Sequence, residues 1–364
     1  MSTESAPTTP DNPATGGGRP HEAIGKKMVQ GLAWTVFFTV GNRVLSFVSQ
    51  FLLGWLLLED DYRIYAFVAP LAGVSVSLVN GGLDRLLIQR SRKFHVLAFQ
   101  SFKVATGCNI GLGVGMAVLA MLLAWKHDSA TVGWLALLLA MSVSFSSFPT
   151  LYMTKLQAEL RFGPYSTLLL ASTTCSHLMS IVLAAVGAGP YAFIVPLVVM
   201  NFANVFLFRY AAGPLPSKGR LTWRRAKVML WQCRWILATA FAAILIYQGD
   251  YLVIGWFDEP WVGTYFFGYK LSTAFTAIVS FAIAKVTLAG FAKIAKEPER
   301  FKAAVVRAAG LIALTTTPVA IALALIVPAA VHFAWQGKWD ASIFVAALMT
   351  AIIPVDLLNI FCRT

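Results

Sequence analysis

Two stretches of the sequence decide the fold: FLLGWLLLEDDYRIYAFVAPLAG at 51–73 and YLVIGWFDEPWVGTYFFGYKLST at 251–273. In each, an apolar run ends at a Gly-Trp pair, an acidic turn follows, and a second apolar run contains a tyrosine. The corresponding residues are Gly54 and Gly255, Trp55 and Trp256, and Tyr65 and Tyr265. We interpret the pair as an internal repeat, although a Gly-Trp pair before an acidic turn is also an ordinary way to end a membrane span.

Composition places the chain in a membrane. Hydrophobic residues make up 58% of the 364 residues and charged residues only 12%. With a mean hydropathy of +0.71, the chain has too few polar residues to cover a soluble domain. Apolar runs of about 20 residues, the length that crosses a bilayer, recur along the chain. They predict an all-α polytopic membrane protein with roughly ten spans, at 31–58, 64–83, 97–124, 132–153, 165–187, 191–208, 236–256, 262–284, 308–330 and 343–361.

The basic residues predict the orientation of these spans. A net charge of +13 would suggest a nucleic-acid partner for a soluble protein, but here the charge follows the topology, and no nucleic-acid partner is expected. Most of the 29 lysines and arginines lie on the side of the amino terminus, whereas the opposite side has Arg63, Lys126 and Lys338. By the positive-inside rule, both termini are expected in the cytoplasm.

Composition shifts divide the chain into four expected segments. Residues 1–28, rich in Thr, Pro, Gly and Ser, are predicted to be a disordered cytoplasmic tail. Residues 29–209 should form an amino-terminal six-helix bundle, 210–235 a basic cytoplasmic linker, and 236–364 an incomplete carboxy-terminal bundle. Because an even number of spans separates the two copies of the repeat, the two bundles are expected to be parallel repeats with a cleft between them.

Four segments, in this order, resemble the O-antigen and polysaccharide flippases of the multidrug/oligosaccharidyl-lipid/polysaccharide exporter superfamily. They are LLLEDDYRIYAFVAPLAGVSVSLVNGGLDRLLIQR at 56–90, LQAELRFGPYSTLLLAS at 156–172, DYLVIGWFDEPWVGTYFFGYKLS at 250–272 and KIAKEPERFKAAVVRA at 293–308. The chain departs from the family at Arg63, where glycine is usual, and it ends at Thr364 before the family's last helices. We therefore expect a truncated or reduced member.

The resemblance implies a function as well as a fold. It implies a flippase that moves polyprenyl-diphosphate-linked oligosaccharide across the bacterial cytoplasmic (inner) membrane by alternating access. The product would be a surface polysaccharide, such as the O-antigen of lipopolysaccharide or an exopolysaccharide. The expected partners are this substrate, membrane lipid and a coupling cation, H⁺ or Na⁺.

Ionisable residues at membrane depth identify the candidate binding site, because each costs at least about 2.5 kcal/mol to insert. Arg43 lies near the middle of the first span with Asn42 beside it. A guanidinium can bind a diphosphate with two parallel hydrogen bonds, so Arg43, Asn42 and Lys270 are the predicted substrate-binding residues. Alternatively, Arg43 pairs with a carbonyl or carboxylate group and holds helices together.

Candidate ion-coupling residues are Asp250, Asp356 and His177. Asp250 and Lys270 lie at similar depths on consecutive antiparallel spans, so we expect them to reach one another. Such a pair is either structural or contains a carboxylate that takes up a cation. A lone histidine such as His177 is more often a hydrogen-bonding group between helices. The four cysteines are scattered, and neither a metal site nor a cofactor is expected.

Three other functions compete with the flippase prediction. A membrane glycosyltransferase could use Glu59, Asp60 and Asp61, but the loops on that side are too short to fold a catalytic domain, so we do not expect an enzyme. A cation-coupled multidrug exporter would keep the fold and change the cargo. A non-transporting remnant would follow from the missing helices.

Overall fold

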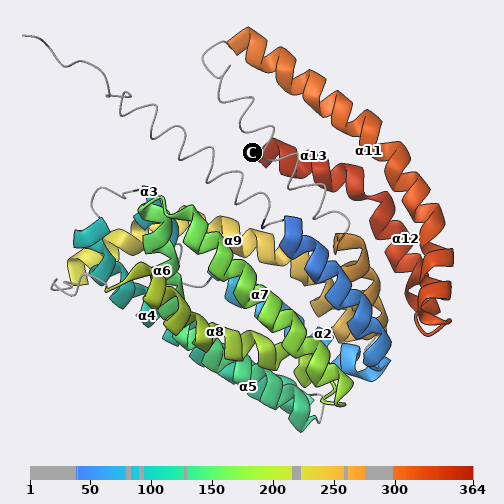
Figure 1. Cartoon of the computed structure of the whole chain (residues 1–364), viewed down its shortest axis with the longest axis horizontal. Helices are drawn as coiled ribbons and strands as arrows, with labels where there is room; N and C mark the ends of the chain where they lie inside the picture. Colours follow the sequence, from blue (N-terminus) through green and yellow to red (C-terminus); the bar gives the residue numbers. More distant parts are fainter. Residues whose placement is uncertain are drawn as a thin grey trace, which may run out of the picture.

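The structure, a computed structural model, describes residues 38, 40–78, 83–89, 94–126, 129–214, 223–257, 261–274 and 298–363. The predicted tail at 1–28 lies outside these residues, as does the second part of the span predicted at 262–284. Helices and turns make up the described part, and it contains no strand, so the all-α prediction is confirmed (Figure 1). The helices are 40–56, α2 (Glu59–Leu78), α3 (Leu83–Gln89), α4 (Phe94–Lys126), α5 (Ala130–Phe145), α6 (Ser147–Ala158), α7 (Phe162–Ala185), α8 (Tyr191–Ala212), α9 (Trp223–Phe257), 261–274, α11 (Pro298–Trp335), η3 (Asp340–Ser342), α12 (Ile343–Ala351) and α13 (Ile353–Arg363).

Several of these helices are long and apolar enough to cross a membrane. Among the described residues there are 5 such helices, or up to 7 if each of two bent helix pairs is one span. Helices 40–56 and 261–274 lie beside undescribed residues, and the charged first turn of α2 makes that helix more polar. The multi-pass membrane class is confirmed. At 38 residues, α11 is about 57 Å long and extends well beyond a hydrocarbon core of about 30 Å.

Two predicted spans are each broken into two helices by a bend of 45°. The span predicted at 132–153 becomes α5 and α6, which meet at Ser146, and the span predicted at 343–361 becomes α12 and α13, which meet at Ile352. Pro149 follows the first break and Pro354 the second. A proline has no N–H to donate to the carbonyl four residues before it, so the helical ladder is interrupted at each site.

The structure supports the predicted repeat of two parallel halves. Counted as spans, α5–α6 is the fourth of the first half and α12–α13 the fourth of the second, so the bent element recurs at the equivalent place. Arg63 and Gly263 hold equivalent positions in the two copies, and they touch. A Cβ atom at Gly263 would lie 2.8 Å from the backbone nitrogen of Arg63. Contact between equivalent positions is expected close to a two-fold axis.

The chain connects the halves differently from the predicted linker at 210–235. Helix α8 continues to Ala212, and α9 starts at Trp223 and runs without a break into the next span. Only the middle of the predicted linker is therefore outside a described helix. On α9, the Arg234 guanidinium lies 3.8 Å from the centre of the Trp231 ring. Aromatic and basic side chains of this kind commonly anchor a helix at the membrane interface.

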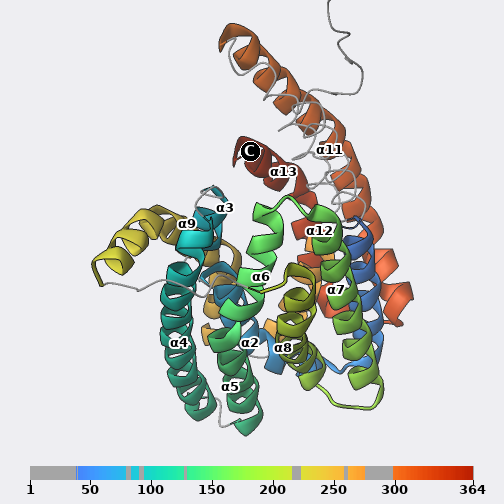
Figure 2. The ribbon, with the colours of Figure 1, turned by 60° about the vertical axis from the view of Figure 1, so that its left-hand side comes forward.

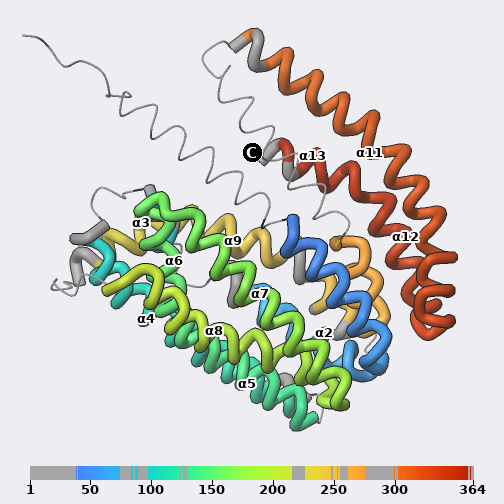
Figure 3. The backbone as a smooth tube through the Cα atoms, viewed as in Figure 1, coloured from blue at the N-terminus to red at the C-terminus, as the bar shows by residue number. Residues whose placement is uncertain are grey.

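Packing is dense within the first half and at one end of the molecule. In the first half, α2, α4, α5 and α8 share a buried apolar cluster that includes Val68, Met116, Leu135 and Ile194. Helix α11 approaches helix 40–56 through its Trp335 end, and its Pro298 end stands apart from α3 and α6 (Figures 1 and 2). After the turn that follows Trp335, the chain returns along α12 and α13, which pack on α11 (Figure 3).

Candidate functional site

A cavity between the two halves holds two of the predicted substrate-binding residues. We call it the cationic cavity; its volume is about 350 Å³. Its lining residues are Arg43, Ser46, Gln50, Tyr65, His177, Phe193, Phe266, Lys270, Thr273 and Ala274. Arg43 comes from helix 40–56 in the first half and Lys270 from helix 261–274 in the second. The cavity is therefore built jointly by both halves.

The charges in this cavity have one sign. No aspartate or glutamate is among the described residues that line it. The Lys270 ammonium lies 5.3 Å from the centre of the Phe266 ring, a distance at which the ring attracts a cation. Neither Arg43 nor Lys270 forms an ion pair with a described carboxylate. Two cationic groups without a described carboxylate partner are suited to an anionic ligand.

A second, neutral cavity lies inside the first half. We call it the hydroxyl cavity; its volume is about 530 Å³, and its walls come from helix 40–56, α5, α7 and α8. Its polar lining residues are Ser46, Ser49, Gln50, Ser142, Ser146, Ser172, Thr173, Ser176, His177, Ser180, Asn201 and Asn204. Ser46, Gln50, His177 and Phe193 line both cavities, so the two adjoin.

The two halves are joined at one end, which we call the closed end; it contains the turns at 57–58 and 336–339. The indole N–H of Trp339 donates to the Gly54 carbonyl at 2.9 Å, and that of Trp335 donates to the Phe51 carbonyl at 3.3 Å. The Trp339 ring stacks on Phe267 with centroids 4.0 Å apart. These contacts seal helix 40–56 of the first half against α11 and helix 261–274 of the second.

Lys338 completes the seal at the end of helix 40–56. Its ammonium donates to the carbonyl oxygens of Gly54 and Trp55, at 3.2 and 3.3 Å, and to that of Leu57. The last carbonyls of a helix lack partners within the helix and attract a cation, so Lys338 caps it from the other half. Burial lowers the pKa of Lys338 from its usual value, and the charges of Glu59 and Asp61 act in the opposite direction.

Asp250 has different partners from those expected. The Tyr265 hydroxyl donates to one carboxylate oxygen at 2.6 Å, and the Tyr251 backbone N–H donates to the other at 2.9 Å. No ion pair forms between Asp250 and Lys270 among the described residues, so the expected pairing is wrong. Consecutive antiparallel helices bring the two residues to similar depths, but rotation about the helix axes turns Lys270 toward the cationic cavity.

The other predicted site residues are dispersed. His177 lies at the boundary of the two cavities, where its Nε2 is 3.0 Å from the Ser46 hydroxyl. Asn42 is next to Arg43 but does not line the cationic cavity, and its buried side-chain oxygen has no hydrogen-bond partner among the described residues. Asp356 lies in the first turn of α13 and lines neither cavity. The structure therefore groups Arg43, Lys270 and His177 and leaves Asp250 and Asp356 apart from them.

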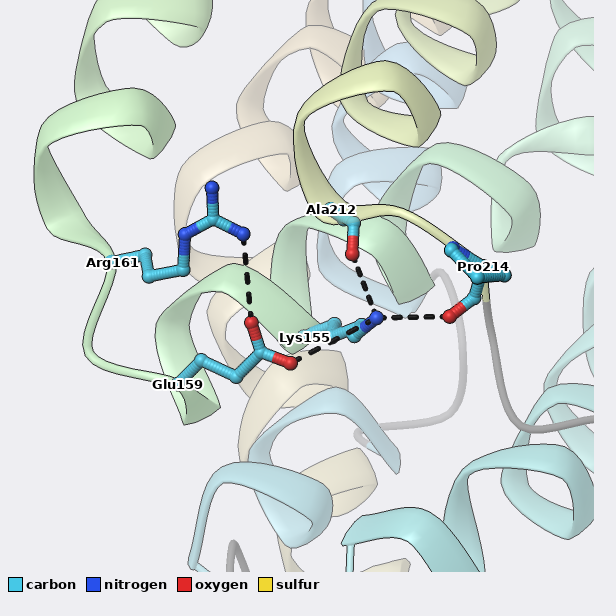
Figure 4. A network of polar contacts seen from close by, with 5 residues as sticks. All are labelled: Lys155, Glu159, Arg161, Ala212 and Pro214. Atoms are coloured by element: carbon cyan, nitrogen blue, oxygen red, sulfur yellow. Dashed lines mark hydrogen bonds and ion pairs between the residues drawn. The ribbon is translucent and has the colours of Figure 1, made fainter.

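The opposite end of the first half is held by a polar network (Figure 4). The Lys155 ammonium donates to the carbonyls of Ala212 and Pro214 at 2.7 and 2.9 Å, which ties α6 to the end of α8. Glu159 lies between Lys155 and Arg161, at 3.8 and 3.7 Å from their nitrogens. Because these cations are occupied by carbonyl and carboxylate groups, this network is structural.

Sequence reasoning missed both the hydroxyl cavity and the closed end. The spacing of Ser172, Ser176 and Ser180 along α7 places them on one helical face and could have indicated a polar surface. The contacts of Lys338 and Trp339 with Gly54 join residues remote in sequence, and no local pattern identifies them. The Gly-Trp repeat did point to the right region.

Comparisons with known proteins agree with this architecture. The sequence pattern of a family described as polysaccharide biosynthesis proteins matches residues 52–344. A solved structure titled lipid II flippase MurJ, inward closed conformation, superimposes with a TM-score of 0.65 at 13% identity, covering 90% of this chain and 73% of that one. That likeness shows a shared fold. No curated protein matches the sequence significantly. Because the family pattern spans most of the chain, from the first Gly-Trp pair into α12, the chain belongs to the polysaccharide biosynthesis protein family.

Proposed function

We propose that this protein is a flippase that moves a polyprenyl-diphosphate-linked oligosaccharide across the bacterial cytoplasmic membrane. The observation that carries the proposal is that Arg43 and Lys270, one from each half, line a single cavity that has no described carboxylate. A diphosphate carries negative charge on several oxygens, and a guanidinium can bind two of them at once. In this proposal the diphosphate occupies the cationic cavity.

Alternating access supplies the movement. A site built from two halves changes its exposure when the halves rock against each other. The seal formed by Trp335, Lys338 and Trp339 would close the outward side, and the substrate would enter from the cytoplasm. The small number of basic residues at the closed end supports this orientation, with both termini in the cytoplasm.

Coupling to H⁺ or Na⁺ is assigned to Asp250. Its carboxylate lies at membrane depth on α9 and keeps hydrogen bonds to neutral donors only. An aspartate in such a place can exchange a cation, since no basic side chain of the described residues forms an ion pair with it. Asp356 and His177 remain candidate members of the same relay.

Substitutions in the cationic cavity test the proposal. Arg43→Ala and Lys270→Ala should each weaken substrate binding by about 2 kcal/mol, or roughly thirty-fold, because each removes a charge-assisted contact. Arg43→Lys keeps the positive charge but loses the planar guanidinium that binds two oxygens at once, so its loss of binding should lie between those of the wild type and Arg43→Ala. The readout is surface-polysaccharide display in a host that lacks its own flippase, normalised to the amount of protein in the membrane.

Arg307→Ala is the matched control, because this exposed arginine of α11 lies outside the cavity. It should display polysaccharide at the wild-type level. If the two cavity variants also retain wild-type display at normal membrane levels, the cavity does not bind the substrate and the proposal fails.

A further inference from the structure

The hydroxyl cavity has the chemistry of a site for an uncharged ligand. His177, at its border with the cationic cavity, is the only ionisable side chain among its described lining residues. The other polar groups are serine and threonine hydroxyls and the amides of glutamine and asparagine. Hydroxyls both donate and accept hydrogen bonds, and amides do the same through separate atoms. This combination is matched to a ligand rich in hydroxyl groups and is unsuited to a charged one.

Two residues that line this cavity each have a buried side-chain oxygen without a hydrogen-bond partner among the described residues. Ser49 is 1% exposed, and its hydroxyl has no hydrogen bond; the side-chain oxygen of Asn204 is also buried without a partner. Hydroxyls in membrane helices usually bond back to a carbonyl of the preceding turn, as Thr173 does to Leu169 at 2.9 Å. Leaving a buried polar group unsatisfied costs about 1–3 kcal/mol. A polar ligand that forms hydrogen bonds with Ser49 and Asn204 would remove this cost.

The size and position of the cavity fit such a ligand. Its volume of about 530 Å³ lies within the range of roughly 300–1,000 Å³ that small-molecule sites occupy. It adjoins the cationic cavity through Ser46, Gln50 and His177. A ligand with its anionic group near Arg43 could therefore extend a covalently attached neutral group into the hydroxyl cavity.

We propose that the hydroxyl cavity binds the sugar attached to the diphosphate of the lipid-linked substrate, with Ser49 and Asn204 as hydrogen-bonding residues. This inference rests on the proposed function and adds a separate compartment for the neutral part of the ligand. The diphosphate and the sugar would then be recognised by different groups of residues.

Binding of two probes to the purified full-length protein in detergent tests the inference. One probe is undecaprenyl diphosphate that carries a single N-acetylhexosamine, and the other is undecaprenyl diphosphate without sugar. The double variant Ser49→Ala with Asn204→Leu should lose about ten-fold in affinity for the first probe and remain close to wild type for the second. Arg43→Ala should weaken both probes equally.

Controls separate this inference from the proposed function. Thr174→Val on α7 lies outside the hydroxyl cavity and should change neither affinity. Ser49→Ala alone, the smallest change, should show a weaker form of the same selective loss. If wild-type protein binds neither probe, the proposed function fails. If it binds both, and the double variant loses affinity for both alike or for neither, the flippase proposal stands and the cavity holds only water.

Discussion

At the scale of single residues, Gly54 is the position where the closed end has no room. A Cβ atom there would lie 2.7 Å from the Trp335 indole nitrogen and 2.8 Å from the Phe267 ring. Gly54→Ala should therefore destabilise the protein by about 1–3 kcal/mol, because the aromatic rings must shift. The measurement is the Tm of the purified protein in detergent.

Gly41, on the same helix, provides the matched substitution. A Cβ atom at Gly41 meets nothing within 4 Å. Gly41→Ala should stabilise the helix by about 0.5–1 kcal/mol, because alanine loses less backbone entropy than glycine. Equal Tm changes in the two variants would show that the close approach at Gly54 does not affect stability.

At the scale of elements, the hydrogen bond between Asp250 and Tyr265 joins α9 to helix 261–274. Tyr265→Phe removes this bond from a carboxylate and should lower stability by about 1.5–3 kcal/mol, with transport retained. Asp250→Asn keeps an oxygen that accepts the bond but cannot take up a cation. It should leave Tm nearly unchanged and reduce transport.

The two variants thus separate structure from coupling at one contact. Transport is measured as surface-polysaccharide display, and stability as Tm on the same preparations. Wild-type display by Asp250→Asn would exclude this carboxylate from ion coupling.

At the scale of the whole molecule, rocking of the halves requires the contact between Arg63 and Gly263 to change. A Cβ atom at Gly263 would lie 2.8 Å from the backbone nitrogen of Arg63 and 3.1 Å from its Cβ, so a cysteine at 263 must move the two helices slightly apart. That movement brings the two Cβ atoms toward the separation of about 3.5–4.5 Å that a disulfide spans. The double variant Arg63→Cys with Gly263→Cys should form a disulfide that holds the closed end shut. Oxidation should abolish flipping in proteoliposomes.

Reduction supplies the control in the same sample. With its native cysteines replaced by serine, the double variant should recover transport when a reductant opens the bond, and each single cysteine variant should be insensitive to oxidation. Full transport by completely oxidised protein would show that the halves do not separate at this contact.

Much of the fold follows from the sequence, because its signals are local. The length of each apolar run, the positions of basic residues and the prolines inside spans act on single helices, and together they predict a polytopic all-α protein. The Gly-Trp repeat identifies equivalent parts of the two halves. Prolines inside spans indicate kinks, but the sequence does not say which of them breaks a helix: Pro149 and Pro354 accompany the two 45° bends, whereas Pro196 lies within the continuous helix α8.

The sequence by itself determined that the chain crosses a membrane, that two like halves build it, and that Arg43 and Lys270 are candidates for an anionic ligand. Only the tertiary structure decided that these two share a cavity, that Asp250 bonds to Tyr265, and that uncharged polar side chains from four helices line a second compartment. The physical reason is rotation: membrane burial sets the length of a helix, but packing against its neighbours decides which face each side chain turns inward.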